Sequence, residues 1–170
     1  TESKEAEKTQ QNNTKPLVEK IELCAPVSGT VKALSDVPDK TFAEKVLGDG
    51  AAIIPEEGKV YAPADGTVAN IMDSKHGIMF VTDNGAEVLI HIGLDTVNLK
   101  GKYFKSYVSD GDKVKKGTLL VEFDLEAIKG EGYNLITPMV VTNISDYIKA
   151  VCMEKENTAI NAGDKFLTVV

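Results

Sequence analysis

The chain has 170 residues, of which 42% are hydrophobic and 26% charged, a composition typical of a soluble globular domain. Its formal net charge is −7 and no segment is rich in lysine or arginine, which disfavours binding to nucleic acid or to an anionic membrane surface. No apolar run approaches the roughly 18 residues that span a bilayer, and the polar residues 1–8 lack the apolar core of a signal peptide.

Residues 1–20 are rich in Glu, Lys, Gln and Asn and contain Pro16, so they cannot bury much apolar surface. We expect a flexible tail or interdomain linker there and one domain over residues 21–170. The sequence opens on Thr1 without an initiator methionine, which suggests an excised fragment or a processed protein.

Beyond the tail, short apolar β-branched runs alternate with clusters of Gly, Pro, Asp and Asn. Such a pattern predicts an all-β fold, either an antiparallel sandwich or a barrel. The predicted strands are 29–34, 51–54, 66–72, 77–82, 87–92, 117–123 and 165–170. Helical patterns are weak, so we expect only short helical turns at 42–48, 124–130 and 144–153.

Two segments of the sequence return later in similar form. Residues 24–31, CAPVSGTV, are echoed by residues 61–68, YAPADGTV, and residues 110–114 are echoed by residues 162–166. In each copy of the first pair a proline starts a turn, a glycine follows, and a β-branched strand begins. The echoes predict a duplicated β motif.

The chain has only two histidines, His76 and His91, and both fall in one predicted hairpin around Asn84-Gly85. A two-residue turn would pair Ile78 with His91 and leave His76 diagonal to it on the same face. A three-residue turn would instead align the apolar faces of the two strands, which burial favours.

In that second register Gly77 lies opposite His91, and we expect open space above the imidazole. A twist or bulge at Gly77 would then turn the ring of His76 toward the ring of His91. Strand alternation places His91 on the exposed face with Glu87 and Leu89. Geometry alone permits a histidine pair without requiring it.

Other chemistry-bearing residues are few. Two histidines fall short of the three or four ligands of a usual zinc site, so we expect no metal, and no cofactor motif is present. Cys24 and Cys152 lack CxxC spacing and an adjacent cation, so we interpret them as small buried residues in a reducing compartment.

The segment Gly85–Val97, GAEVLIHIGLDTV, resembles the active-site signature of the glucose-type IIA domain of the bacterial phosphoenolpyruvate-dependent sugar phosphotransferase system. The resemblance extends from about residue 21 to the end, through segments 37–51, 61–68, 99–101, 121–125 and 135–143. It implies an antiparallel β-sandwich with a duplicated half motif and a phosphotransferase that works through a phosphohistidine.

The resemblance also implies roles for individual residues. His91 would accept a phosphoryl group from the phosphohistidine of the carrier protein HPr and pass it to a cysteine of a IIB domain, for uptake and phosphorylation of a sugar. His76 would bind the phosphoryl group. Attack would come from Nε2 of His91, with its Nδ1–H held by the carbonyl of Gly93 and with Ser74 fixing the tautomer of His76.

A partner-docking surface follows from the same resemblance. It implies an apolar ring around the histidines with an acidic border, made of Phe42, Val46, Leu47, Met72, Met79 and Leu89, with Asp39 and Asp95 at the border. For Met72 and Met79 an ordinary core position is an equal alternative. The domain would be cytoplasmic, and the linker favours tethering to the membrane through a parent transporter that also carries the IIB domain.

Three other functions remain to be weighed. A zinc hydrolase of related fold needs a further histidine and an aspartate in an HxH-type array, which the sequence lacks. A biotinyl or lipoyl carrier presents a lysine in a hairpin beside methionine, and Lys113, Lys115 and Lys116 lack that setting. A regulatory docking module is compatible with the carrier role.

Overall fold

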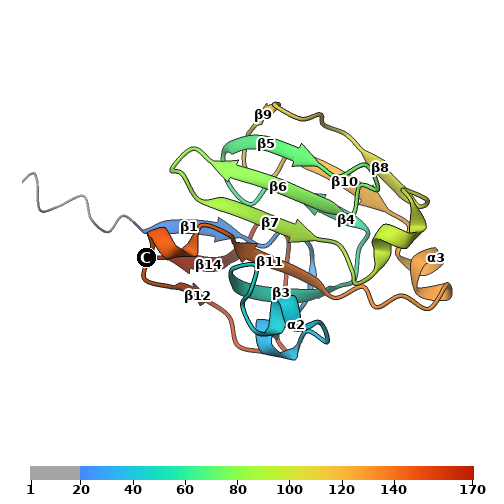
Figure 1. Ribbon diagram of the computed structural model, residues 1–170, viewed down its shortest axis with the longest axis horizontal. Helices are drawn as coiled ribbons and strands as arrows, with labels where there is room; N and C mark the ends of the chain where they lie inside the picture. The colour runs from blue at the N-terminus through green and yellow to red at the C-terminus, as the bar shows by residue number, and fades with distance from the viewer. Residues whose placement is uncertain (1–19) are drawn as a thin grey trace, which may run out of the picture.

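Antiparallel strands make up most of the regular structure of the computed structural model, which describes residues 20–170 (Figure 1). The strands are β1 (Ile21–Cys24), β2 (Gly29–Ala33), β3 (Asp49–Pro55), β4 (Lys59–Tyr61), β5 (Gly66–Ile71), β6 (Gly77–Thr82), β7 (Glu87–His91), β8 (Phe104–Ser106), β9 (Lys113–Val114), β10 (Leu119–Phe123), β11 (Thr137–Val141), β12 (Ala150–Cys152), β13 (Ala159–Ile160) and β14 (Lys165–Val169). The helices are η2 (Leu34–Asp36), α2 (Lys40–Ala43), η3 (Thr96–Leu99), α3 (Leu125–Gly130) and η4 (Ile144–Asp146).

The strands form one large sheet and two small ones. The large sheet has the order β13-β2-β3-β11-β7-β6-β5-β9, and the small sheets are β1-β14-β12 and β4-β10-β8. Residues of all three sheets share one buried core, which includes Leu23, Ile53, Ile78, Leu120 and Leu167. The predicted all-β sandwich is therefore confirmed.

A second, smaller core cluster lies on the outer face of the large sheet. It contains Leu34, Val37, Phe42, Ala52, Leu89, Leu94, Ile136 and Val140, with Met79 packed against it. Because η2 and α2 supply Leu34 and Phe42, these short helices cover that face beside β3, β11 and β7 (Figure 1). The second cluster is the support on which the histidine region rests.

Every predicted strand is present, but two of the three helical predictions need correction. The helix expected at 42–48 is α2, which starts earlier because Asp39 caps it, and left-handed Lys45 (φ 61°) follows its end. Only η4 is helical within 144–153, because the backbone of residues 150–152 pairs with β14 as strand β12. The prediction for 124–130 is confirmed by α3, capped by Asp124.

The sequence echoes correspond to two structural copies that contact each other. The N–H of Cys24 donates to the carbonyl of Pro63 (2.9 Å), and the N–H of Tyr61 donates to the carbonyl of Pro26 (2.8 Å). Cys24 and Tyr61 occupy equivalent positions in the two copies, as do the two prolines, so the bonds are reciprocal. This reciprocity is what a duplicated β motif with internal two-fold pseudosymmetry produces.

The hairpin of β6 and β7 adopts the three-residue-turn register that burial favours. Gly77 lies opposite His91, Ile78 opposite Ile90, and Phe80 opposite Val88. The N–H of Ile92 donates to the carbonyl of His76 (2.7 Å), which extends the pairing beyond the strands. This register brings the two histidines to the same end of the hairpin.

None of the helices within residues 20–170 is long and apolar enough to span a membrane. The predicted tail, residues 1–20, lies outside the described residues except for Lys20.

Candidate functional site

The ring of His91 is fixed by its own backbone turn. Its Nδ1 lies 2.6 Å from the carbonyl oxygen of Gly93, the contact expected from the sequence. A carbonyl oxygen only accepts hydrogen bonds, so Nδ1 carries the hydrogen and donates it. In the neutral ring the lone pair then resides on Nε2, which is the nitrogen available to attack an electrophile.

Glycine at position 93 allows this turn. Its φ of 74° is left-handed, and a Cβ there would lie 2.8 Å from the Cγ2 of Thr96 and 3.0 Å from the carbonyl oxygen of Asn134. Thr96 is buried and its hydroxyl donates to the carbonyl of Ile92 (2.5 Å), which closes the turn from the other side. The loop after β7 is thus shaped to present a carbonyl to His91.

His76 is held against Ser74 and stands next to His91. The Oγ of Ser74 lies 2.5 Å from Nδ1 of His76. In the tautomer whose Nδ1 accepts from this hydroxyl, the hydrogen of the neutral ring is on Nε2. The two imidazole centroids are 4.7 Å apart and the rings meet edge to face at 84°. The structure therefore brings the two histidines together, as the sequence permitted.

Both imidazoles are kept neutral, chiefly by burial. Burial, aided by the nearby His91, lowers the pKa of His76 from 6.5 to about 4. Burial also lowers the pKa of His91, against the opposing effects of the Gly93 carbonyl and of the Asp39 and Asp95 carboxylates. Both rings are consequently unprotonated near pH 7, the state that a nucleophilic nitrogen and a neutral hydrogen-bond donor require.

The space opposite His91 is not open, contrary to expectation. A Cβ on Gly77 would lie only 2.5 Å from the Sδ of Met72, so the Met72 side chain fills that place. The prediction that Leu89 and His91 lie on an exposed face is wrong for Leu89, which is buried in the second core cluster, and His91 is half-buried. Glu87 is exposed as predicted.

The predicted docking residues divide into an exposed group and a buried group. Val46, Leu47 and Met72 are 70%, 39% and 37% exposed, and Met79 is half-buried. Phe42 and Leu89 are buried, so they contribute little exposed apolar area. The phenyl ring of Phe42 and the imidazole ring of His91 are close neighbours, with centroids 5.2 Å apart.

Two acidic residues flank the site without touching the imidazoles by a hydrogen bond. Asp39 caps α2 by accepting from the N–H of Thr41 (2.9 Å), and Asp95 is exposed in a left-handed conformation at the start of η3. Their negative charges act on His91 and partly oppose the lowering of its pKa by burial.

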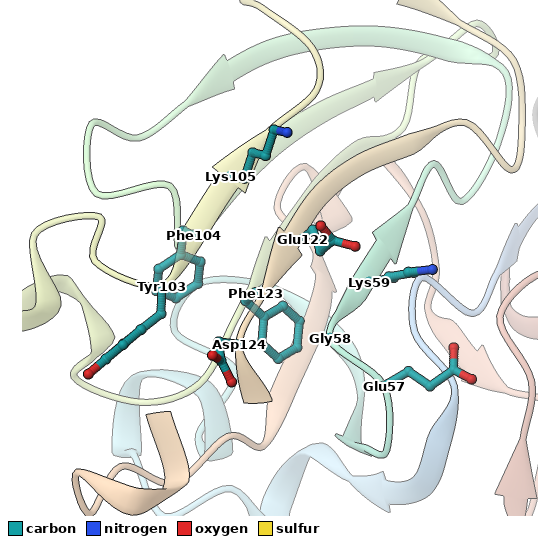
Figure 2. A pocket seen from close by; sticks show the side chains of 9 residues that line it. All are labelled: Glu57, Gly58, Lys59, Tyr103, Phe104, Lys105, Glu122, Phe123 and Asp124. Atoms are coloured by element: carbon teal, nitrogen blue, oxygen red, sulfur yellow. The ribbon is translucent and has the colours of Figure 1, made fainter. Parts of the chain in front are cut away.

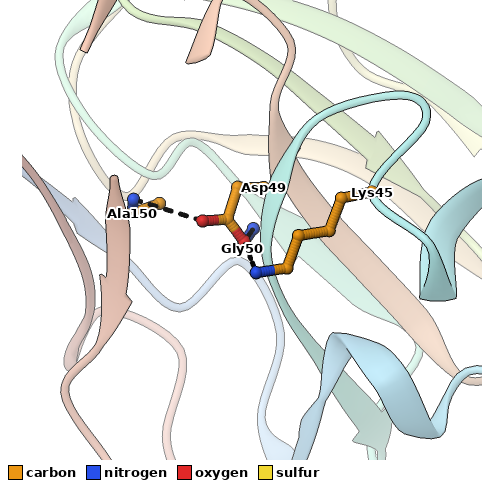
Figure 3. A network of polar contacts seen from close by, with 4 residues as sticks. All are labelled: Lys45, Asp49, Gly50 and Ala150. Carbon is orange, nitrogen blue, oxygen red and sulfur yellow. Dashed lines mark hydrogen bonds and ion pairs between the residues drawn. The ribbon is translucent and has the colours of Figure 1, made fainter. Parts of the chain in front are cut away.

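Asp49 anchors the segment that carries Val46 and Leu47. Its carboxylate accepts from the N–H of Gly50 (2.9 Å), lies 3.4 Å from the Nζ of Lys45, and accepts from the N–H of Ala150 in β12 (3.4 Å) (Figure 3). The exposed apolar residues are therefore held on a loop tied to the neighbouring sheet.

Sequence reasoning missed two participants. Asn134, whose carbonyl accepts from Leu94 and borders Gly93, comes from a distant loop with no recognisable pattern. Thr96 lies in the signature segment, but no periodicity of the sequence indicates that it is buried or that its hydroxyl donates to the carbonyl of Ile92.

A hollow of about 580 Å³ lies elsewhere, over the small sheet β4-β10-β8 (Figure 2). Its lining combines the charged residues Glu57, Lys59, Lys105, Glu122 and Asp124 with Tyr103, Phe104 and Phe123. None of the predicted site residues lines it, so it is separate from the histidine pair.

Comparison with known proteins gives consistent relatives. The family model of the phosphoenolpyruvate-dependent sugar phosphotransferase system, EIIA 1, matches residues 21–147. The glucose-specific EIIA component of Halalkalibacterium halodurans is 46% identical over 146 residues, which cover 86% of this chain and 83% of that one. Glucose permease IIA from Mycoplasma capricolum has a similar structure, with a TM-score of 0.79, 31% identity, and coverage of 89% of this chain and 96% of that one.

Some relatives are much longer. The beta-glucoside-specific EIIBCA component of Bacillus subtilis (strain 168) is 53% identical over 123 residues, which are 72% of this chain. The chain spans only 20% of the length of that relative. A similar EIIBCA component from Halalkalibacterium halodurans is matched over 23% of its length.

Proposed function

This chain belongs to the EIIA 1 family of the phosphoenolpyruvate-dependent sugar phosphotransferase system, and from that premise we propose that His91 is its phosphoryl acceptor. The chain is accordingly a phosphoryl-carrying component of a phosphotransferase system. The observation that carries the assignment to His91 is the bond from its Nδ1–H to the Gly93 carbonyl, which leaves Nε2 free and nucleophilic beside His76.

In the proposed step the lone pair of Nε2 attacks the phosphorus of phosphohistidine on HPr. The N–P bond of the donor breaks, its electron pair stays on the donor imidazole, and a new N–P bond forms on His91. The Nδ1–H remains in place, and the Gly93 carbonyl stabilises the positive charge that the ring acquires. In delivery the cysteine sulfur of the IIB domain attacks the phosphorus, the N–P bond of His91 breaks with its electron pair returning to Nε2, and a new S–P bond forms.

His76 serves as the neutral donor to the phosphoryl oxygens. Ser74 holds its Nδ1, so its Nε2–H is available to a phosphoryl group on the neighbouring ring. Phosphoryl transfer requires mainly positioning and electrostatic stabilisation, and this pair of anchored imidazoles supplies both.

The surface around the histidines suits successive docking of two partners. Val46, Leu47, Met72 and Met79 offer an apolar ring with Asp39 and Asp95 at its border. An acidic border favours basic residues of HPr, whereas the apolar ring accepts any partner of complementary shape. The acceptor is a IIB domain, and the EIIBCA relatives support its presence in the same parent chain, which would tether the domain to the cytoplasmic side of the membrane.

The proposal is tested by intact mass after incubation with phosphoenolpyruvate, enzyme I and HPr. One added phosphate, stable to base and labile to acid, is expected on the parent chain and none on the His91→Gln variant. The His76→Gln variant is the matched control, because it removes the other imidazole of the pair and should still gain the phosphate. Undiminished phosphate on His91→Gln would overturn the assignment.

A further inference from the structure

The thioether of Met72 occupies a defined place beside the nucleophile. Residues directly opposite each other in an antiparallel pair point to the same face of the sheet, so the Cβ direction of Gly77 is that of the His91 side chain. A Cβ there would lie 2.5 Å from the Sδ and 2.9 Å from the Cε of Met72. The sulfur of Met72 is therefore the cross-strand neighbour of His91, in the place of a side chain at position 77.

The loop that carries His76 starts at this methionine. The N–H of Met72 donates to the carbonyl of Gly77 (3.0 Å) and the N–H of Lys75 donates to the carbonyl of Met72 (2.7 Å). Lys75 is left-handed, with φ of 62°, which lets the chain turn back within these few residues. A chemical change at Met72 thus acts on the wall of the site and on the loop that orients His76.

Access to oxidants differs among the four methionines of the chain. Met139 is fully buried and Met79 is half-buried against the second core cluster, whereas Met72 and Met153 are 37% and 51% exposed. Met153 follows β12, in the small sheet β1-β14-β12, and so serves as an exposed methionine away from the histidine hairpin. Met153 is therefore an internal control for methionine oxidation away from the histidine pair.

We propose that Met72 is an oxidation site and that its conversion to the sulfoxide by a peroxide slows phosphoryl transfer through His91. This inference rests on the proposed function. In the step, a lone pair of the sulfur attacks one peroxide oxygen, the O–O bond breaks and an S–O bond forms. The sulfur loses two electrons and hydrogen peroxide is reduced to water.

Two consequences of the sulfoxide oppose transfer. The new oxygen is a strong hydrogen-bond acceptor on the exposed Met72 of the proposed docking surface, so a docking partner would have to bury it without a matching donor. The sulfoxide also changes the wall of the site beside His91 and the first residue of the loop that orients His76.

The test compares the parent chain, Met72→Leu and Met153→Leu before and after treatment with hydrogen peroxide. The readout is the initial rate of phosphoryl acceptance from phospho-HPr, with sulfoxide at each methionine measured by peptide mass. We expect the treated parent and Met153→Leu to lose about fivefold or more of their own untreated rate, and Met72→Leu to lose less than about twofold. Methionine sulfoxide reductase should restore the rate, whereas a thiol reductant alone, which reverses cysteine oxidation, should not.

Either of two results would overturn the inference. One is an unchanged rate in a parent chain whose Met72 is fully converted to sulfoxide; the other is equal sensitivity of Met72→Leu and the parent. Failure of the proposed function looks different, because the untreated parent would then accept no phosphate at all.

Discussion

The imidazole rings of His76 and His91 meet edge to face, with centroids 4.7 Å apart and planes at 84°. Each ring has one nitrogen held by the protein, at the Ser74 hydroxyl and at the Gly93 carbonyl respectively. In the proposed function the second nitrogen of each ring meets the transferred group. The two rings then act asymmetrically, because His91 offers a lone pair and His76 offers a hydrogen.

The asymmetry predicts that His76→Gln separates acceptance from delivery. The variant keeps Nε2 of His91 and should accept phosphate from HPr, while onward transfer to a IIB domain falls by about a hundredfold or more because the donor to the phosphoryl oxygens is displaced. Single-turnover measurement of the two steps checks this. Equal losses in both steps would show that His76 acts only on the shape of the site.

The hairpin was the most predictable part of the site. Asn84-Gly85 and the alternation of apolar residues on both sides allow only one register that buries Ile78 and Phe80, and that register sets Gly77 opposite His91. The contact of His91 with the Gly93 carbonyl was implied by the family resemblance of the segment Gly85–Val97, and it lies within one short turn. The predictable features of the site are thus those made by residues close together in the sequence.

What sequence patterns did not predict depends on contacts between distant segments. The Met72 side chain covers Gly77 because the pairing of β5 with β6 continues to these two residues, after a register shift between Val68 and Asn70 that no periodicity encodes. Asn134 meets Gly93 only through the fold. Strand β11 is buried throughout, so it shows no alternation, and Pro138 argues against a central strand, although β11 lies centrally in the large sheet.

The lowered histidine pKa values predict a pH dependence of stability. The pKa of His76 is lowered from 6.5 to about 4, so between these values the unfolded chain binds more protons than the folded one. The contribution of His76 to the free energy of unfolding therefore falls as the pH drops from about 6.5 to about 4, and it is constant at higher pH. Urea unfolding between about pH 4 and 7 should show a shallower decline for His76→Gln than for the parent. Parallel curves for the two proteins would contradict the prediction.

The turn after β7 predicts a large cost for Gly93→Ala. The backbone of Gly93 has a left-handed φ of 74°, which strains any residue with a Cβ. The added Cβ would also lie 2.8 Å from the Cγ2 of Thr96 and 3.0 Å from the carbonyl oxygen of Asn134. We expect a loss of about 2–4 kcal/mol in the free energy of unfolding, together with reduced phosphate acceptance, because the carbonyl that orients His91 must move.

Gly85→Ala is the matched control for that substitution. Its φ is 97° and nothing lies within 4 Å of the added carbon, so only backbone strain remains. We expect a loss of about 1 kcal/mol and unchanged acceptance, measured by urea unfolding and by intact mass. Equal costs at the two glycines would mean that the contacts with Thr96 and Asn134 relax freely.

Asp39 combines a structural and an electrostatic role, which two substitutions separate. Its carboxylate caps α2 through the N–H of Thr41, and its charge acts on His91. Asn caps as well as Asp does, so Asp39→Asn should keep the free energy of unfolding within about 0.5 kcal/mol, whereas Asp39→Ala should lower it by about 1 kcal/mol.

Both substitutions of Asp39 remove the negative charge, so both should slow association with HPr and weaken its dependence on ionic strength to the same extent. Asp36→Asn, which neutralises an exposed acid in η2, is the control for net charge alone. If Asp36→Asn weakens the salt dependence of association as much as the Asp39 variants do, Asp39 is not part of the acidic docking border.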